Sequence, residues 1–299
     1  MIPANGHSEG NWIIDNNATK TTDGSKHTVC TVCGTTVRTE IIPATGSVGI
    51  GYTVTVYGQS CAITGLGSCS DKVVYIPSVI DGYTVTSIGD YAFSFTAITG
   101  VVIPDSVESI GQKAFYRCEK LTSVKIGNSV TSIGESAFYY CTNLTTLTFG
   151  DSLLFIDDYA FSECHRLAKL TLPNGLRPIG KGAFNLCVDI VSVTIPDSVM
   201  SVGDSAFYRC LSLTRVTIGN GVTYIGREAF SNCEKLKSMI LGSKVSSLGN
   251  EVFYDTALST ISYNGTTAQW NAISKGNGWN NTNTFTLTVY CLNGNVKYE

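Results

Sequence analysis

Apolar and polar residues alternate with a fixed period through the middle of the chain, and a phenylalanine marks each period. The first interval between these phenylalanines is 22 residues and the next six are each 23. A constant period of this length indicates that each repeat is one supersecondary unit stacked on its neighbours, so that the chain forms a solenoid. The eight residues, here called the repeat phenylalanines, are Phe93, Phe115, Phe138, Phe161, Phe184, Phe207, Phe230 and Phe253.

Two short apolar stretches in each repeat predict two extended segments. In the repeat after Phe115, residues 123–126 alternate polar and apolar side chains, which is the period of a half-buried strand. Residues 130–133 predict a second extended segment, and residues 135–141 predict a tight or 3₁₀-like turn that carries the next phenylalanine. We therefore expect one parallel strand per coil, a short second strand, and little α-helix.

Glycine lies four residues before the phenylalanine in seven of the eight repeats, and Asp157 takes its place in the other. Glycine at a recurring site indicates either a positive φ or a close approach between coils, and aspartate tolerates such a conformation better than most residues. The seven glycines are Gly89, Gly111, Gly134, Gly180, Gly203, Gly226 and Gly249.

The repeated unit has the form IGxxAFxxCxxLxxVxIP[DN]SV over roughly residues 76–263, and it resembles the BspA-like leucine-rich repeats of bacterial surface proteins. The resemblance implies a β-rich leucine-rich-repeat solenoid with a horseshoe-like form. Residues 61–90 and 263–294 resemble the entry and terminal segments of that family, and solenoid ends require such caps. We expect a small module at 1–46, an N-terminal cap at 47–75, about eight repeats at 76–263 and a C-terminal cap at 264–299.

The N-terminal module carries a Cys-x-x-Cys pair, Cys30 and Cys33, together with His7 and His27. It resembles a small module found in surface proteins of gut Firmicutes. Two cysteines and two histidines could bind zinc, and so small a core would benefit from a metal or a disulfide. One such pair is a weak signal, and the histidine spacing fits no finger pattern. Zinc, a disulfide and unpaired thiols all stay open.

Two further rows follow the same period. Aspartate and asparagine alternate after the first strand, for which we favour Asx turns over a calcium ladder, because one carboxylate per two coils is too sparse for calcium. Cysteine lies three residues after six of the phenylalanines, and we expect buried, reduced, structural thiols there. These ladder cysteines are Cys118, Cys141, Cys164, Cys187, Cys210 and Cys233; the Asx row is Asp105, Asn128, Asp151, Asn174, Asp197 and Asn220.

A net charge of −3 with only 14% charged residues argues against nucleic acid or an anionic membrane as partner. No apolar stretch approaches the ~20 residues that span a bilayer. Residues 1–10 contain neither the positively charged region nor the apolar region of a signal peptide. We expect a mature fragment of an extracellular or cell-surface protein, monomeric in solution, with a cytosolic protein as the alternative.

Catalytic motifs are missing from the sequence. It contains three histidines and neither a zinc-protease motif, a P-loop nor a dinucleotide-binding glycine pattern. Carboxylates are scattered over turn positions instead of being paired. We therefore expect a protein that is not an enzyme and needs no cofactor.

The outward positions of the predicted strands form a threonine-rich, slightly cationic surface, and we expect it to bind a partner. The family resemblance implies adhesion to host or neighbouring-cell proteins, including extracellular-matrix proteins such as fibronectin and fibrinogen. The predicted partner-binding residues are Lys125, Thr148, Lys169, Thr171, Arg215, Thr217 and Lys237. One alternative is a structural spacer, since threonine also suits strands for its β-propensity. Another is glycan binding through Tyr116, Tyr139, Tyr140, Tyr208 and Tyr254.

Overall fold

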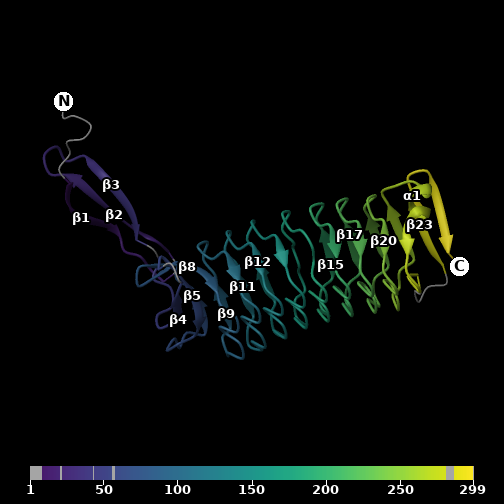
Figure 1. Cartoon of the computed structure of the whole chain (residues 1–299), viewed down its shortest axis with the longest axis horizontal. Helices are drawn as coiled ribbons and strands as arrows, with labels where there is room; N and C mark the ends of the chain where they lie inside the picture. The colour runs from purple at the N-terminus through teal and green to yellow at the C-terminus, as the bar shows by residue number, and fades with distance from the viewer. Residues whose placement is uncertain (1–8, 21, 43, 56–57, 281–285, 299) are drawn as a thin grey trace.

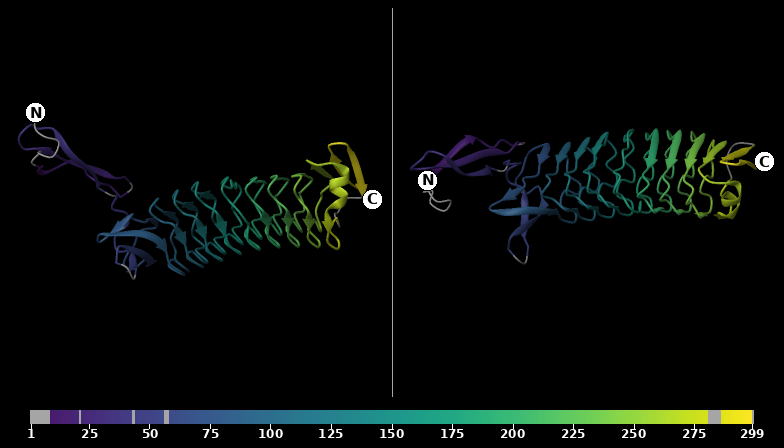
Figure 2. Two further views of the ribbon diagram at one scale, coloured as in Figure 1. Left: turned by 45° about the horizontal axis from the view of Figure 1, so that its top comes forward. Right: turned by 90° about the horizontal axis from the view of Figure 1, so that it is seen from above.

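The repeats wind into one elongated, gently curved row of coils in the computed structural model (Figures 1 and 2). The structure describes residues 9–20, 22–42, 44–55, 58–280 and 286–298. An antiparallel three-stranded sheet projects from the N-terminal end of the row, and a short helix with a hairpin lies at the C-terminal end (Figure 1). The N-terminal sheet consists of β1 (Glu9–Asn16), β2 (Gly24–Cys30) and β3 (Thr36–Ile42).

Two rows of strands run along the solenoid. The first strand row contains β6 (Val73–Tyr75), β9 (Gly100–Val102), β11 (Ser123–Lys125), β13 (Thr146–Thr148), β15 (Ser192–Ile195), β17 (Arg215–Ile218), β19 (Ser238–Leu241), β21 (Thr260–Tyr263), β23 (Leu287–Cys291) and β24 (Gly294–Tyr298). The second strand row contains β4 (Gly51–Val54), β5 (Ser60–Gly65), β8 (Tyr83–Ile88) with its partner β7 (Val79–Ile80), β10 (Ser109–Ile110), β12 (Ser132–Ile133), β14 (Phe155–Ile156), β16 (Ser201–Val202), β18 (Tyr224–Ile225), β20 (Ser247–Leu248) and β22 (Ser274–Lys275).

Strands of neighbouring coils pair in parallel with residues one repeat apart in register. In the first strand row Val101 lies beside Val124, and Val124 beside Leu147. The strand that alternation predicted at 123–126 is β11, and the predicted second extended segment is β12. The predicted solenoid of parallel strands is therefore confirmed, and so is the low helix content, although one coil, at residues 168–172, forms no strand in the first row.

The only helix of the described residues, α1 (Thr267–Ala272), has six residues and is too short to cross a membrane. Its first turn has a capping box, in which Thr266 and Gln269 exchange hydrogen bonds. Trp270 of α1 and Trp279 are both buried next to the last coil. The indole Nε1–H of Trp270 donates to the hydroxyl of Tyr298, 2.8 Å away, and thereby ties the helix to β24.

The repeat phenylalanines form a continuous stack through the core. Each is fully buried, and successive ring centroids lie 4.8 to 6.3 Å apart. Their rings are close to parallel, with interplanar angles from 3° to 23°. Each coil alone has too little apolar area for stability, so stacking is what buries this row and the aliphatic rows beside it.

Glycine at the recurring site permits close approach of coils, and the positive-φ alternative is wrong. A Cβ atom built on Gly203 would lie 2.7 Å from the main chain of Lys181 in the preceding coil, closer than real Cβ atoms come. Left-handed φ values occur instead two residues before and two residues after each phenylalanine. Around Phe115 these residues are Lys113, with φ of 53°, and Arg117, with φ of 54°.

The Asx row bonds between coils. The predicted turn at Asp105 is closed by the main chain, because the Val107 N–H donates to the carbonyl of Pro104. The Asp105 carboxylate accepts instead from the N–H of Asn128, 2.7 Å away in the next coil. Asp197 accepts from Asn220 in the same way at 2.6 Å. The row therefore links neighbouring coils.

The ladder cysteines are buried and are not in disulfides. Each thiol donates to the carbonyl of the repeat phenylalanine in the preceding coil, as Cys187 does to Phe161 over 3.1 Å. Burial away from water raises the pKa of the Cys164 and Cys187 thiols well above the usual range, because it disfavours the charged thiolate.

We expect the ladder cysteines to resist a thiol reagent at neutral pH in the folded protein, because all six are fully buried and the reagent has no access to them. After denaturation without reductant, all six should react. Alkylation followed by peptide mass spectrometry measures both states. Failure to react in denaturant, reversed by a reductant, would show that the ladder is oxidised.

Candidate protein-binding face

The outward side chains of the first strand row form one long surface, here called the strand face. Parallel register aligns these side chains in rows along the solenoid, so that Lys125 lies beside Thr148, and Thr194 beside Thr217. Alternation places the apolar residues of the same strands in the core. The strand face is therefore a ribbon of small polar side chains with a few cations.

Those cations are available to a partner. Lys125, Lys169, Arg215 and Lys237 are all exposed. Over the described ranges, none of the four forms an ion pair with a carboxylate. Exposed cations without a carboxylate partner can steer an acidic protein toward the surface.

The structure brings only some of the predicted residues together. Thr148, Lys169 and Thr171 line one open groove of about 400 Å³. Lys125 lines a different groove of about 490 Å³, whose opposite wall includes Lys20 from the N-terminal segment. The contribution of the N-terminal segment to this groove could not be foreseen from the repeat pattern.

The remaining predicted residues lie farther along the same surface. Arg215 and Thr217 are on β17, where the sheet is continuous, and Lys237 directly precedes β19. Thr217 is half-buried, whereas Arg215 and Lys237 are exposed. The seven predicted residues therefore share a face but do not form a single pocket.

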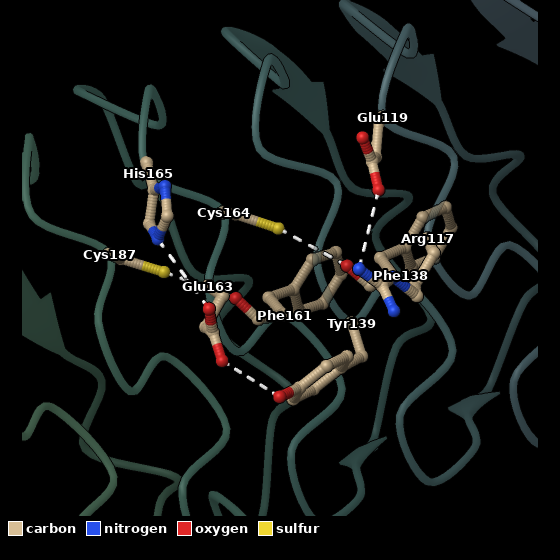
Figure 3. Close-up of polar contacts among 9 residues, drawn as sticks. All are labelled: Arg117, Glu119, Phe138, Tyr139, Phe161, Glu163, Cys164, His165 and Cys187. Carbon is tan, nitrogen blue, oxygen red and sulfur yellow. Dashed lines mark hydrogen bonds and ion pairs between the residues drawn. The ribbon is translucent and has the colours of Figure 1, made fainter. Parts of the chain in front are cut away.

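A second polar and aromatic surface follows the turns that carry the phenylalanines (Figure 3). The rings of Tyr116 and Tyr139 stack with centroids 5.2 Å apart, and the guanidinium of Arg117 lies 4.6 Å from the ring centroid of Tyr140. Glu163 joins this row, because its carboxylate accepts from the Tyr139 hydroxyl at 2.7 Å.

The contact with Glu163 has an electrostatic consequence. The hydrogen bond to the Glu163 carboxylate raises the pKa of Tyr139 to about 12, because it favours the neutral phenol. His165 lies 3.7 Å from the other oxygen of the same carboxylate (Figure 3). The sequence predicted a role for the tyrosines of this surface but not for Glu163. That residue directly precedes Cys164, which the sequence singled out only as a ladder cysteine.

In the N-terminal sheet, Cys30 is buried and Cys33 is exposed. The Cys30 sulfur accepts from the Val32 N–H, and the Cys33 thiol lies 3.1 Å from the Thr35 hydroxyl. His27 turns away from both cysteines and contacts the Asp15 carboxylate at 2.6 Å. His7 lies outside the described residues. No group of three or more histidine, cysteine and acidic side chains suited to a metal occurs within those residues.

The repeat geometry can be compared with known families. A family model of the BspA type leucine rich repeat region, in six copies, matches residues 86–211 and 155–274, well over half of the chain. The chain belongs to the BspA-type leucine-rich repeat family. Its 23-residue coils, parallel strand row and buried phenylalanine stack are thus how this sequence builds the BspA-type repeat.

Solved structures of bacterial leucine-rich repeat proteins resemble the BspA-type solenoid described above. A T. pallidum leucine-rich repeat protein is 29% identical, with a TM-score of 0.54, over 69% of this chain and 86% of its own. One from Bacteroides ovatus is 27% identical, with a TM-score of 0.56, over 78% of this chain and 68% of its own. No curated protein matches the chain.

Membership of the BspA-type family and these likenesses support a repeat-protein binding or scaffold module. Leucine-rich repeat proteins are generally non-catalytic, because an extended solenoid presents a surface and not an enclosed pocket. A surface of this kind can hold a second macromolecule across several coils, and each coil contributes a few weak contacts.

Proposed function

We propose that the chain is a non-catalytic module that binds an acidic partner protein through the strand face, and that it acts in adhesion outside the cell. The observation that carries the proposal is the set of four exposed cations on the strand face, which have no carboxylate partner among the described residues. A surface whose charge is not neutralised within its own chain is suited to a partner of the opposite charge.

The flat shape of the strand face also supports a protein as the partner. Threonines on neighbouring coils lie in register, and the strands between them are held by the buried core. Such a rigid ribbon loses little conformational entropy on binding, since its main chain is already fixed. The partner contributes the acidic side chains, and the cations guide its approach.

The double substitution K169S/R215S tests this proposal. Both side chains are exposed on the strand face, so their loss should leave the melting temperature nearly unchanged. Binding to an acidic protein captured from an array of host-matrix and bacterial-surface proteins should weaken about tenfold and lose much of its salt dependence. Surface plasmon resonance at several salt concentrations measures both effects.

A matched control removes two cations elsewhere. Arg177 and Lys244 are exposed and lie outside the strand face, so R177S/K244S changes the net charge equally. Normal binding by K169S/R215S would contradict a strand-face site. Equal weakening of binding by the two double variants would also contradict it, because it would indicate a general effect of net charge.

A spacer that holds another domain away from a surface is the second candidate. The uninterrupted phenylalanine stack favours it, because a continuous core makes the coils one stiff rod. Glycan binding by the turn tyrosines has less support. Tyr116 and Tyr139 stack on one another, so the faces they turn to each other are unavailable to a sugar ring.

A further inference from the structure

The first strand row is interrupted once in its middle. β13 pairs with β11 on one side, and β15 pairs with β17 on the side away from it. The segment between them in the stack, residues 168–172, forms no strand. The break is visible as a missing arrow between β13 and β15 in the row of strands in Figure 2.

The hydrogen bonds that join other coils are absent at the break. In the coils before it, the Thr145 N–H donates to the Thr122 carbonyl, and the Ile126 N–H to the Thr148 carbonyl. The equivalent bonds would use the Thr145 carbonyl and the Phe149 N–H, and neither forms within the described ranges. The main chain of residues 169–172 likewise has no hydrogen bond to any described residue. Both sides of the break therefore present free donors and acceptors.

Phe149 distinguishes β13 from the strands of the neighbouring coils. The position of Phe149 holds isoleucine or leucine in the neighbouring coils from Ile126 to Leu241, and Tyr263 holds it in the coil of β21. The Phe149 ring is half-buried and packs edge-on against Phe161, with centroids 5.6 Å apart. A phenyl ring needs more room than an aliphatic side chain, and a close-packed core yields by moving its neighbour. The missing ladder bonds and the groove between the two segments mark the coil that contains Lys169 as displaced from β13.

The displacement opens the groove of about 400 Å³ that Thr145–Phe149, Lys169 and Thr171 line. Its lining combines threonine hydroxyls with the half-buried apolar side chains of Leu147 and Phe149. Lys169 supplies the only charge of that lining. Unpaired main chain, a partly apolar floor and one cation together match an extended polypeptide that carries an acidic residue.

We propose that this groove captures an extended, acidic segment of the partner protein, whose main chain pairs with the open edges of β13 and residues 169–172. The inference rests on the proposed function, and it names how the strand face would hold its partner. An acidic side chain of the segment meets Lys169, and alternate apolar side chains cover Leu147 and Phe149.

Hydrogen exchange of the full chain tests the open edge directly. The amides of Phe149 and residues 169–172 should exchange at least about tenfold faster than those of β17, which is paired on both sides, because they form no main-chain hydrogen bond that must first open. F149I introduces the aliphatic residue of the neighbouring coils and should slow the exchange of these amides. Equal protection of both segments in the wild-type protein would overturn the proposal.

Peptide capture tests the ligand. We expect a displayed library of random peptides of about eight residues, a usual strand length, to yield acidic, β-branched sequences that bind the wild-type chain. F149I and K169E should each weaken their binding at least about tenfold. Methylation of alternate peptide amides should abolish it. K169E changes an exposed side chain and keeps the test valid should F149I misfold.

The outcomes separate this inference from the proposed function. Peptides that bind F149I as well as the wild-type chain, or no selected peptide at all, would overturn capture in the groove. If a matrix protein nevertheless binds K169S/R215S more weakly than the wild-type chain, the strand face remains the binding surface, but the partner is not held by strand pairing in the groove. If the selected peptides bind as expected but no matrix protein depends on Arg215, peptide capture in the groove is supported. Binding of a partner across the whole strand face is then contradicted.

Discussion

Replacing Phe184 with alanine is expected to lower the free energy of unfolding by about 3–5 kcal/mol. The side chain is fully buried, and its ring stacks between Phe161 at 5.5 Å and Phe207 at 5.3 Å. Truncation removes its apolar contacts and leaves a cavity that the fixed spacing of the coils prevents from closing. Chemical denaturation followed by circular dichroism measures the loss.

Val191 provides the matched control, because it lies in the same coil and is 50% exposed. V191A should change stability by less than about 0.5 kcal/mol. A loss below about 1 kcal/mol for F184A would contradict a stack that holds the coils together.

Truncation of Trp270 is the second large effect that we expect, again about 3–5 kcal/mol. This indole is fully buried, packs edge-on against Tyr263 at 5.4 Å and donates a hydrogen bond to Tyr298. Because coils contact only their neighbours, the damage should spread inward from the C-terminal end and leave distant coils intact. Hydrogen exchange should therefore accelerate in β19 and β21 and stay unchanged in β9 and β11.

Tyr290 of β23 serves as control, since it is an aromatic residue of the same terminal segment but is 48% exposed. Y290A should leave exchange in β21 close to the wild-type rate. Uniform acceleration along the whole solenoid in W270A would show that the coils unfold as one cooperative unit, which the nearest-neighbour picture excludes.

Much of the fold could be predicted because each structural role recurs. A polar–apolar alternation that returns every 23 residues defines β11 and β17 even though each strand is very short. The left-handed residues escaped prediction, because Lys113 and Arg117 have no local preference for that conformation. The hydrogen-bond ladder between coils imposes it on them.

The candidate site was only partly foreseeable, for a related reason. The cations of the strand face follow from alternation, since an outward position is outward in every coil. The break beside β13 does not, because a pattern of apolar positions treats Phe149 as equivalent to isoleucine. Side-chain volume distinguishes them, and a phenyl ring between the aliphatic residues Ile126 and Leu172 was the available signal. That Lys20 lines the groove with Lys125 depends on where the N-terminal segment meets the first coils, which the repeat pattern does not determine.

The close spacing of the stacked phenylalanines has a mechanical consequence. Phe138 and Phe161 are 23 residues apart in the sequence, yet their rings lie 5.0 Å apart along the stack. The same 23 residues pulled straight would span roughly 80 Å. Under tension applied at its two ends, the solenoid would therefore unfold one coil at a time. Each coil that unfolds would become roughly fifteen times longer than it is in the folded stack. In the adhesive function proposed above, this extension would let the protein stay bound at both ends while the attached surfaces move apart.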